Sequence, residues 1–345
     1  MKLHSKILAV SASFIIVFSG ITAPPSALAQ PFLRISAPSA LLLDPVTNRV
    51  VYSKTPYLRR QPASTTKVLT AIVAYEHFGL DKIVTIQRFA QHVEPSKMQV
   101  FAGERFYSRD LIRATLIKSA NDAAEVLAVA VAGSMPKFAA MMNKKAREIG
   151  CRGSHFVRSS GLPASNQYST AYDLAIIMRY MQRYPFLVET MKVRTMNIHS
   201  LAGRRIYLRN HNKMLWRDPR PVIGKTGWTR AARHCFVGRI GVRNRSVLVA
   251  LMGSHALWRD LKTLVDFEFG TSFFKPKRTI KSAASVEKRR LLQTALKRAG
   301  FYRGRVDGVV GTATLRALKR FQKAKRLPAD GIAGRQTWQK LQAYL

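Results

Sequence analysis

A serine and a lysine three positions apart, Ser64 and Lys67, are the first residues whose types and spacing could do chemistry. On a helix this spacing places both side chains on one face, one turn apart. A serine hydroxyl is a weak nucleophile until a base removes its proton, and a lysine amine is that base only when it is uncharged. The reference pKa of lysine is about 10.4, so burial or nearby positive charge must lower it.

The Ser-x-x-Lys pattern occurs four times, at Ser64, Ser134, Ser272 and Ser285, so it is a weak signal alone. Ser134, followed by Pro136, is typical of a helix N-cap, and Ser285 lies in a polar stretch before another predicted helix. Two further strings favour the copy at Ser64, because Ser-x-Asn and Lys-Thr-Gly each occur once and both lie downstream of it. They are Ser119-Ala120-Asn121 and Lys225-Thr226-Gly227.

These two strings supply complementary chemistry. Ser119 can relay a proton to a leaving amine, and Asn121 can hydrogen-bond a backbone amide of the substrate. Lys225, which can also lower the pKa of a neighbouring lysine, is expected with Thr226 on an edge strand, where both can hold a terminal carboxylate. Gly227 lets a substrate approach that strand closely.

The start of the first predicted helix also suits an anion. The helix dipole favours negative charge near Ser64. The amide of Ser64 is expected to point into a cleft that the three strings line. The amides of Ser64 and Trp228 are expected to form an oxyanion hole, in which one lost donor costs about 2.7–4 kcal/mol of barrier.

The elements that must position these residues can be predicted from hydrophobic periodicity and turn residues. We expect a hairpin over 40–54, helices over 63–78 and 108–133, the second with a break near Ser119, a helix from Ser169-Thr170, strands over 220–252 and a closing helix over 258–269. Strands at both ends with helices between them predict one α/β domain whose sheet joins both termini.

The C-terminal part changes character. The composition of residues 273–285 predicts a basic linker. Residues 286–345 are expected to form a small domain with an internal repeat. The repeat consists of Asp307-Gly308 and Asp330-Gly331, tight turns that each precede a helix. This segment resembles the three-helix peptidoglycan-binding domain of cell-wall hydrolases, in which the turns either bind glycan or only build the fold.

Residues 1–29 have the pattern of a secretory signal peptide: Lys2 and Lys6, an apolar run over 7–21 and the small residues Ala27-Leu28-Ala29. A membrane anchor is the alternative, although the apolar run is short for a span. A cleaved signal predicts export to the periplasm or cell envelope, with the mature domain over 30–272.

The chain carries 58 Lys and Arg against 18 Asp and Glu, a formal net charge of +40. Export argues against nucleic acid as the partner and favours electrostatic contact with an anionic envelope polymer or lipid surface. The alternative is that basic residues are simply this organism's compositional habit.

The two cysteines, Cys151 and Cys235, are either bridged in an oxidising compartment or buried free thiols. His211 and Asp218 share a spacing with some zinc D,D-peptidases, but the flanking residues differ, so we read the pair as coincidence. Neither a metal nor a cofactor is expected.

Over about residues 36–270 the chain resembles the D-alanyl-D-alanine carboxypeptidases of the low-molecular-mass penicillin-binding protein family, peptidase S11. The resemblance rests on the three strings, in order, and on neighbouring segments at 62–67, 119–124, 161–163, 168–174, 210–212 and 224–229. It implies an α/β fold: a serine β-lactamase/D,D-peptidase-like domain, mainly an antiparallel sheet flanked by helices plus a helical subdomain, followed here by the small three-helix domain.

The resemblance also implies a reaction. Ser64 is acylated by the penultimate D-Ala of a peptidoglycan stem pentapeptide, terminal D-Ala leaves, and water releases the tetrapeptide. β-Lactam antibiotics acylate the same serine. Lys67 and Ser119 are the other implied catalytic residues, and the implied substrate-binding residues are Asn121, Lys225, Thr226, Gly227 and Trp228.

Three other functions are alternatives to this reading. A class A β-lactamase needs a Glu-x-x-Leu-Asn string, which does not occur here. A D,D-endopeptidase acting on cross-linked peptidoglycan keeps the same residues. A non-catalytic wall-binding protein is the third, and is kept open by Arg233, which stands where the family usually has glycine. The side chain of Arg233 either alters substrate docking or points to solvent.

Overall fold

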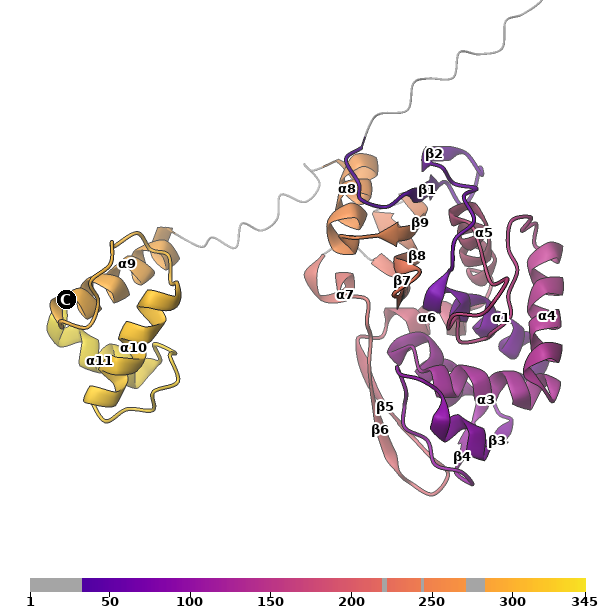
Figure 1. Ribbon diagram of the computed structural model, residues 1–345, viewed down its shortest axis with the longest axis horizontal. Coiled ribbons are helices and arrows are strands. Elements are labelled where there is room, and N and C mark those ends of the chain that lie inside the picture. The colour runs from indigo at the N-terminus through magenta and orange to yellow at the C-terminus, as the bar shows by residue number, and fades with distance from the viewer. Residues whose placement is uncertain (1–32, 219–221, 243–244, 271–282) are drawn as a thin grey trace, which may run out of the picture.

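The computed structural model describes residues 33–218, 222–242, 245–270 and 283–345 (Figure 1). The predicted signal peptide lies outside the described residues, as does most of the predicted linker. Helix α9 begins at Ala283, so the last three residues assigned to the linker are helical, in keeping with the high helix propensity of alanine.

The larger part of the chain, before residue 271, is built around a five-stranded antiparallel sheet ordered β2-β1-β9-β8-β7. The strands are β1 (Ser39–Leu43), β2 (Val50–Lys54), β7 (Val222–Thr229), β8 (Arg233–Val242) and β9 (Arg245–Ser254). The predicted hairpin and the joining of both ends of the domain in one sheet are confirmed, since β1 pairs with β2 and β9. Asn48 takes the left-handed turn conformation, with φ 59°.

Alternate residues of a strand point to opposite faces of the sheet, and here both faces are buried. In β1, Leu41 and Leu43 belong to the core shared with the helical subdomain, whereas Ala40 and Leu42 face a second core. Helix α8 (Leu257–Phe269) closes that second core, and α5 (Ala171–Met181) packs on the other face. Each fully buried leucine contributes roughly 1.5–3 kcal/mol.

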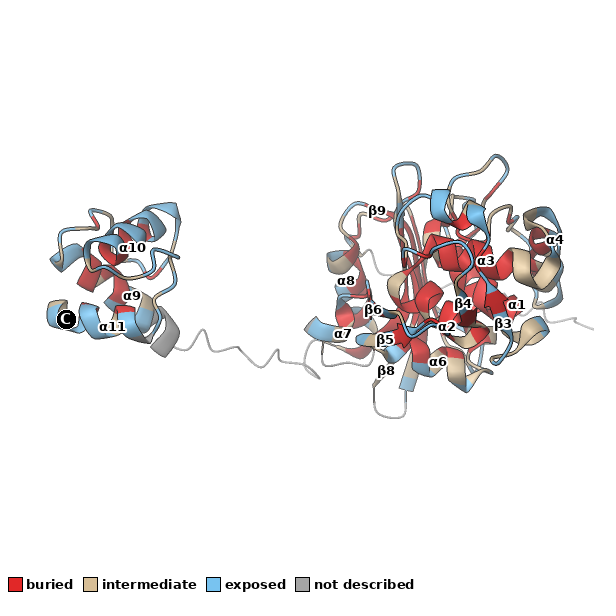
Figure 2. Cartoon of the chain, turned by 90° about the horizontal axis from the view of Figure 1, so that it is seen from below, coloured by how far each residue is buried: buried red, intermediate tan, exposed pale blue. Residues whose placement is uncertain are grey.

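The remaining elements form the helical subdomain and two short ribbons beside the sheet, and their buried residues gather toward the sheet in Figure 2. They are α1 (Lys67–Phe78), β3 (Ile83–Thr85), β4 (Arg105–Tyr107), α2 (Ser108–Arg113), α3 (Asn121–Ala132), α4 (Met135–Glu148), α6 (Pro185–Lys192), β5 (Thr195–His199), β6 (Arg205–Arg209) and α7 (Met214–Arg217). Within the described ranges, no single helix meets the length and hydropathy of a membrane span; only α3 and α4 taken together, bent by 88°, do so.

The C-terminal helices α9 (Ala283–Arg298), α10 (Thr312–Ala324) and α11 (Arg335–Leu341) share a core of their own. The two repeated turns build this fold in the same way. Gln293 Nε2 donates to Asp307 Oδ1 at 2.9 Å, and Gln293 Oε1 accepts from Gly308 N at 2.7 Å. Gln322 repeats both contacts with the second turn, at 2.9 and 3.0 Å. These aspartates and glycines therefore have a structural role.

Candidate active site

Ser64 lies in a tight turn directly before α1. We predicted one helix over 63–78, but its first turn is a 3₁₀ helix, η1 (Ala63–Thr66), and the α-helix begins at Lys67. The turn packs against Gly161, where an added Cβ would lie 2.0 Å from the carbonyl oxygen of Ala63. This close approach leaves room only for glycine and holds the half-buried Ser64 at the mouth of the site.

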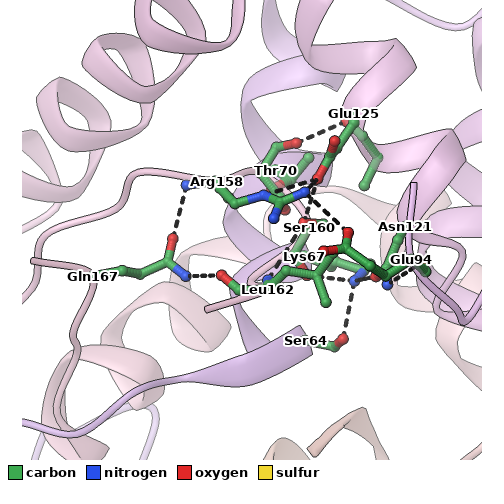
Figure 3. Close-up of polar contacts among 12 residues, drawn as sticks. Ser64, Lys67, Thr70, Glu94, Asn121, Glu125, Arg158, Ser160, Leu162 and Gln167 are labelled. Atoms are coloured by element: carbon green, nitrogen blue, oxygen red, sulfur yellow. Dashed lines mark hydrogen bonds and ion pairs between the residues drawn. The ribbon is translucent and has the colours of Figure 1, made fainter. Parts of the chain in front are cut away.

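Lys67 is fully buried beneath Ser64 (Figure 3). Its Nζ lies 2.9 Å from Ser64 Oγ and donates to Asn121 Oδ1 at 2.6 Å and to the carbonyl oxygen of Ser160. Burial, and then the positive charge of Lys225, hold the pKa of Lys67 well below its usual value. A neutral amine has two N–H groups, which these two acceptors use, so its lone pair is left for the Ser64 proton.

The second string faces this pair across the cleft, at the predicted break in the helix. A π turn over Ala114–Lys118 ends α2, and Ser119 takes a left-handed conformation before α3 begins at Asn121. The buried Ser119 Oγ accepts a hydrogen bond from Lys225 Nζ at 2.8 Å. Burial lowers the pKa of Lys225 to about 7, so near neutral pH Lys225 can both give up and take up a proton beside Ser119.

The third string lies on β7, which is the edge strand of the sheet as predicted. A cleft of about 580 Å³ brings the strings together. Its lining includes Ser64, Ser119, Asn121, Thr226, Gly227 and Trp228. Lys67 and Lys225 are buried and reach the same groups from beneath. All eight site residues predicted from the sequence therefore meet at one place.

Gly227 is needed for this arrangement. A Cβ there would lie 2.8 Å from the backbone nitrogen of Ser64 and 3.1 Å from that of Thr65. We predict that Gly227→Ala moves the Ser64 amide and slows acylation by labelled penicillin about 10²–10³-fold, as expected for a damaged oxyanion hole. Gly311→Ala is the matched control, since an added Cβ there meets nothing within 4 Å. Equal acylation rates in the two variants would contradict this use of Gly227.

Sequence reasoning did not assign one residue that lines the cleft, His211. It was named in the zinc spacing and in the 210–212 segment of the resemblance, but was given no role. In the cleft, partial desolvation and the nearby Lys225 lower its pKa to about 4, so it is a neutral imidazole at pH 7. Its neighbours in the Asn210-His211-Asn212 string were the available signal. No group of three or more His, Cys, Asp and Glu in the described part of the chain could hold a metal.

Two open questions from the sequence have structural answers. Arg233 has φ 58° and is exposed at the end of the β7–β8 hairpin, outside the residues that line the cleft. Its side chain thus points to solvent, in a conformation that costs a non-glycine residue about 1–2 kcal/mol. Cys151 and Cys235 are both buried and free, and burial raises the pKa of Cys235 to about 11.

Comparison with known proteins agrees with this geometry. Residues 25–256 match the family model of D-alanyl-D-alanine carboxypeptidase, peptidase S11, and residues 285–341 match that of a putative peptidoglycan binding domain. The chain belongs to the peptidase S11 D-alanyl-D-alanine carboxypeptidase family, with a peptidoglycan-binding domain at its C-terminal end. The family resemblance seen in the sequence is confirmed.

Individual relatives match the N-terminal two thirds. D-alanyl-D-alanine carboxypeptidase DacB2 of Mycobacterium tuberculosis is 31% identical, over 66% of this chain and 81% of the relative. DacF of Bacillus subtilis is 28% identical over 64% of this chain, which spans only 58% of that longer protein. A D-alanyl-D-alanine endopeptidase of Escherichia coli is 32% identical over 67% of this chain and 75% of the relative.

Solved structures confirm the predicted fold class. The crystal structure of D-alanyl-D-alanine carboxypeptidase from M. tuberculosis H37Rv is similar with a TM-score of 0.67 and 29% identity, covering 70% of this chain and 94% of that one. A mutant of the Streptomyces K15 DD-transpeptidase gives a TM-score of 0.65 at 25% identity, over 69% of this chain and 99% of that one.

Proposed function

We propose that this protein is a serine-type D-alanyl-D-alanine carboxypeptidase that removes terminal D-Ala from peptidoglycan stem pentapeptides, and that β-lactams acylate its Ser64. The observation that carries the proposal is the buried Lys67 amine 2.9 Å from Ser64 Oγ, inside a cleft that also holds the other two strings. Family membership and the names of the relatives agree with it.

In the acylation step Ser64 Oγ attacks the penultimate D-Ala carbonyl, and its proton passes to the neutral Lys67 amine. The amides of Ser64 and Trp228 stabilise the oxyanion. The C–N bond then breaks, and the leaving D-Ala nitrogen takes a proton from Ser119, which Lys225 replaces through its 2.8 Å contact. Thr226 and Lys225 hold the terminal carboxylate, and Asn121 a backbone amide.

In deacylation, water adds to the ester carbonyl and its proton returns through Ser119 to Lys225. The C–O bond to Ser64 breaks, and Ser64 regains its proton from Lys67. Every group is then in its starting state, and the products are the tetrapeptide and free D-Ala.

The test is product analysis with two substrates. We expect the mature protein to release D-Ala from a muropentapeptide faster than it cleaves a cross-linked muropeptide dimer. The second candidate, a D,D-endopeptidase, is favoured by relatives of that name in E. coli and Pseudomonas aeruginosa. Preferential cleavage of the dimer would select it, and no cleavage of either substrate would favour a non-catalytic wall-binding protein.

We also propose that residues 1–29 direct export, that 30–272 form the catalytic domain, and that 286–345, together with the start of α9 at Ala283, hold the enzyme on the wall after a linker that begins at residue 273. A family model of peptidoglycan-binding domains supports the last assignment. The enzyme would then work in the periplasm or cell envelope. Its positive charge adds attraction to anionic envelope polymers.

The binding role has its own test. Deleting residues 273–345 should weaken pelleting with purified sacculi but leave hydrolysis of small substrates unchanged, because all the proposed catalytic residues lie before residue 273. Pelleting should be measured over a range of salt, since charge alone retains basic proteins at low ionic strength. Undiminished pelleting of the truncated protein at moderate salt would contradict this assignment.

A further inference from the structure

An ion pair with a buried carboxylate and a partly exposed guanidinium lies behind Lys67. Glu125 of α3 is paired with Arg158, which precedes α5: the guanidinium donates from Nη2 at 2.8 Å and from Nε at 3.2 Å to Glu125 Oε1. Only 7% of Glu125 is exposed. Burying the Glu125 carboxylate costs desolvation energy that an ion pair often does not offset, so its presence beside the proposed base suggests a use.

The pair is connected to one hydrogen-bond acceptor of Lys67. The same Glu125 oxygen accepts from Ser160 Oγ at 2.7 Å, and the Ser160 carbonyl accepts from Lys67 Nζ (Figure 3). Ser160 is fully buried and is followed by Gly161, which is packed against the turn that carries Ser64. The Glu125 carboxylate thus fixes the orientation of a carbonyl group that holds the amine.

The pair is also connected to the other acceptor. Arg158 Nη2 lies 3.4 Å from Glu94 Oε2, and the Glu94 carbonyl accepts from Asn121 Nδ2 at 2.9 Å. Asn121 Oδ1 in turn accepts from Lys67 Nζ at 2.6 Å. Gln167 Oε1 accepts from the Arg158 backbone nitrogen at 2.8 Å, which fixes the segment that carries the guanidinium. Both acceptors of the amine are therefore tied to one ion pair.

We propose that Glu125 and Arg158 are positioning residues for the acylation step: the pair orients the two acceptors of the Lys67 amine, and its opposite charges balance each other at that amine. This inference rests on the proposed function, because it assigns a role to residues that act through Lys67.

The charged groups around Lys67 make the balance measurable. The groups whose charges act on Lys67 are Lys225 of β7, Asp122 and Glu125 of α3, and Arg158, with His211 neutral nearby. Lys225 and Arg158 lower the pKa of Lys67, whereas Glu125 and Asp122 raise it. Removing one charge of the pair therefore leaves the other uncompensated, and the two removals act in opposite directions.

The experiment is the acylation rate by labelled penicillin as a function of pH. Glu125→Gln should move the acid limb of the profile to lower pH, and Arg158→Gln should move it to higher pH, each by at least about half a pH unit. The double variant should return the limb close to the wild-type position. In Glu125→Gln the plateau rate should also fall roughly tenfold, because a neutral amide holds the Ser160 hydroxyl, and with it the Ser160 carbonyl, less firmly than the carboxylate does.

Three further measurements separate positioning from folding. Ser160→Ala removes only the hydroxyl link to Glu125, so the plateau should fall several-fold while the limb stays in place. Glu76→Gln breaks another largely buried ion pair, with Lys145 at 2.9 Å, and should leave the profile unchanged. Thermal melting of each variant shows whether it is folded.

The outcomes distinguish this inference from the proposed function. A wild-type protein that is not labelled at all contradicts the proposed function. A labelled wild type with limbs that move in the same direction, or do not move, in the Glu125 and Arg158 variants overturns the positioning role. An unchanged plateau in Ser160→Ala overturns the part of it that acts through the carbonyl.

Discussion

Replacing Ser64 by alanine should lower the release of D-Ala from a muropentapeptide by at least about 10⁴-fold, because loss of a covalent nucleophile leaves only binding and oxyanion stabilisation. The substitution removes one oxygen atom at a half-buried position, so the protein should remain folded. The measurement is kcat for D-Ala release, with the melting temperature recorded alongside.

The chain supplies its own matched control for this prediction. Ser134 belongs to a second Ser-x-x-Lys copy and caps α4, where its Oγ accepts from Lys137 N at 3.4 Å. Ser134→Ala should cost about 1 kcal/mol of stability and leave the rate of D-Ala release unchanged. If Ser64→Ala retained a rate close to that of Ser134→Ala, Ser64 would not be the nucleophile.

Replacing Lys67 by methionine should slow acylation by about 10⁴-fold, near the upper end for loss of a general base. The pH dependence of the acylation rate gives a second prediction, which is the direction of the change. Acylation needs the neutral amine, so the wild-type rate is lost as pH falls through the lowered pKa of Lys67 and is recovered as pH rises above it. Lys67→Met should lose this acid limb together with most of its rate. Acylation by labelled penicillin across the pH range measures both.

Lys137 of the second Ser-x-x-Lys copy is the control for this substitution, because it is exposed on α4. Lys137→Met should retain both the rate and the limb. A Lys67→Met protein that keeps a wild-type acid limb would show that another group accepts the Ser64 proton.

The parts of the site that could be predicted are those whose side chains do the chemistry. The three strings and their order predicted one cleft, and all eight residues meet there. The break near Ser119 was also predictable, because turn residues are a local property of a sequence. The edge position of Lys225 was expected from the chemistry of its string, which needs a strand that a substrate can approach. The distances between these residues were not predictable, since they depend on how α1, α3 and β7 pack.

The rest depended on tertiary structure. The Ser160 carbonyl that accepts from Lys67 is a backbone group, so its position cannot be predicted from residue types. Glu125 and Arg158 lie 33 positions apart and meet only because α3 packs beside the segment that precedes α5. The 3₁₀ turn at Ser64 also escaped prediction, and it packs closely against Gly161, a contact between segments far apart in the sequence.

The most direct test of the account is the site of the covalent label. The mature protein is incubated with benzylpenicillin, its intact mass is measured, and the modified peptide is sequenced by mass spectrometry. We predict a single adduct, carried by Ser64 and absent from Ser64→Ala. No adduct, an adduct on another residue, or one that persists in Ser64→Ala would contradict the proposal that Ser64 is the acylated nucleophile.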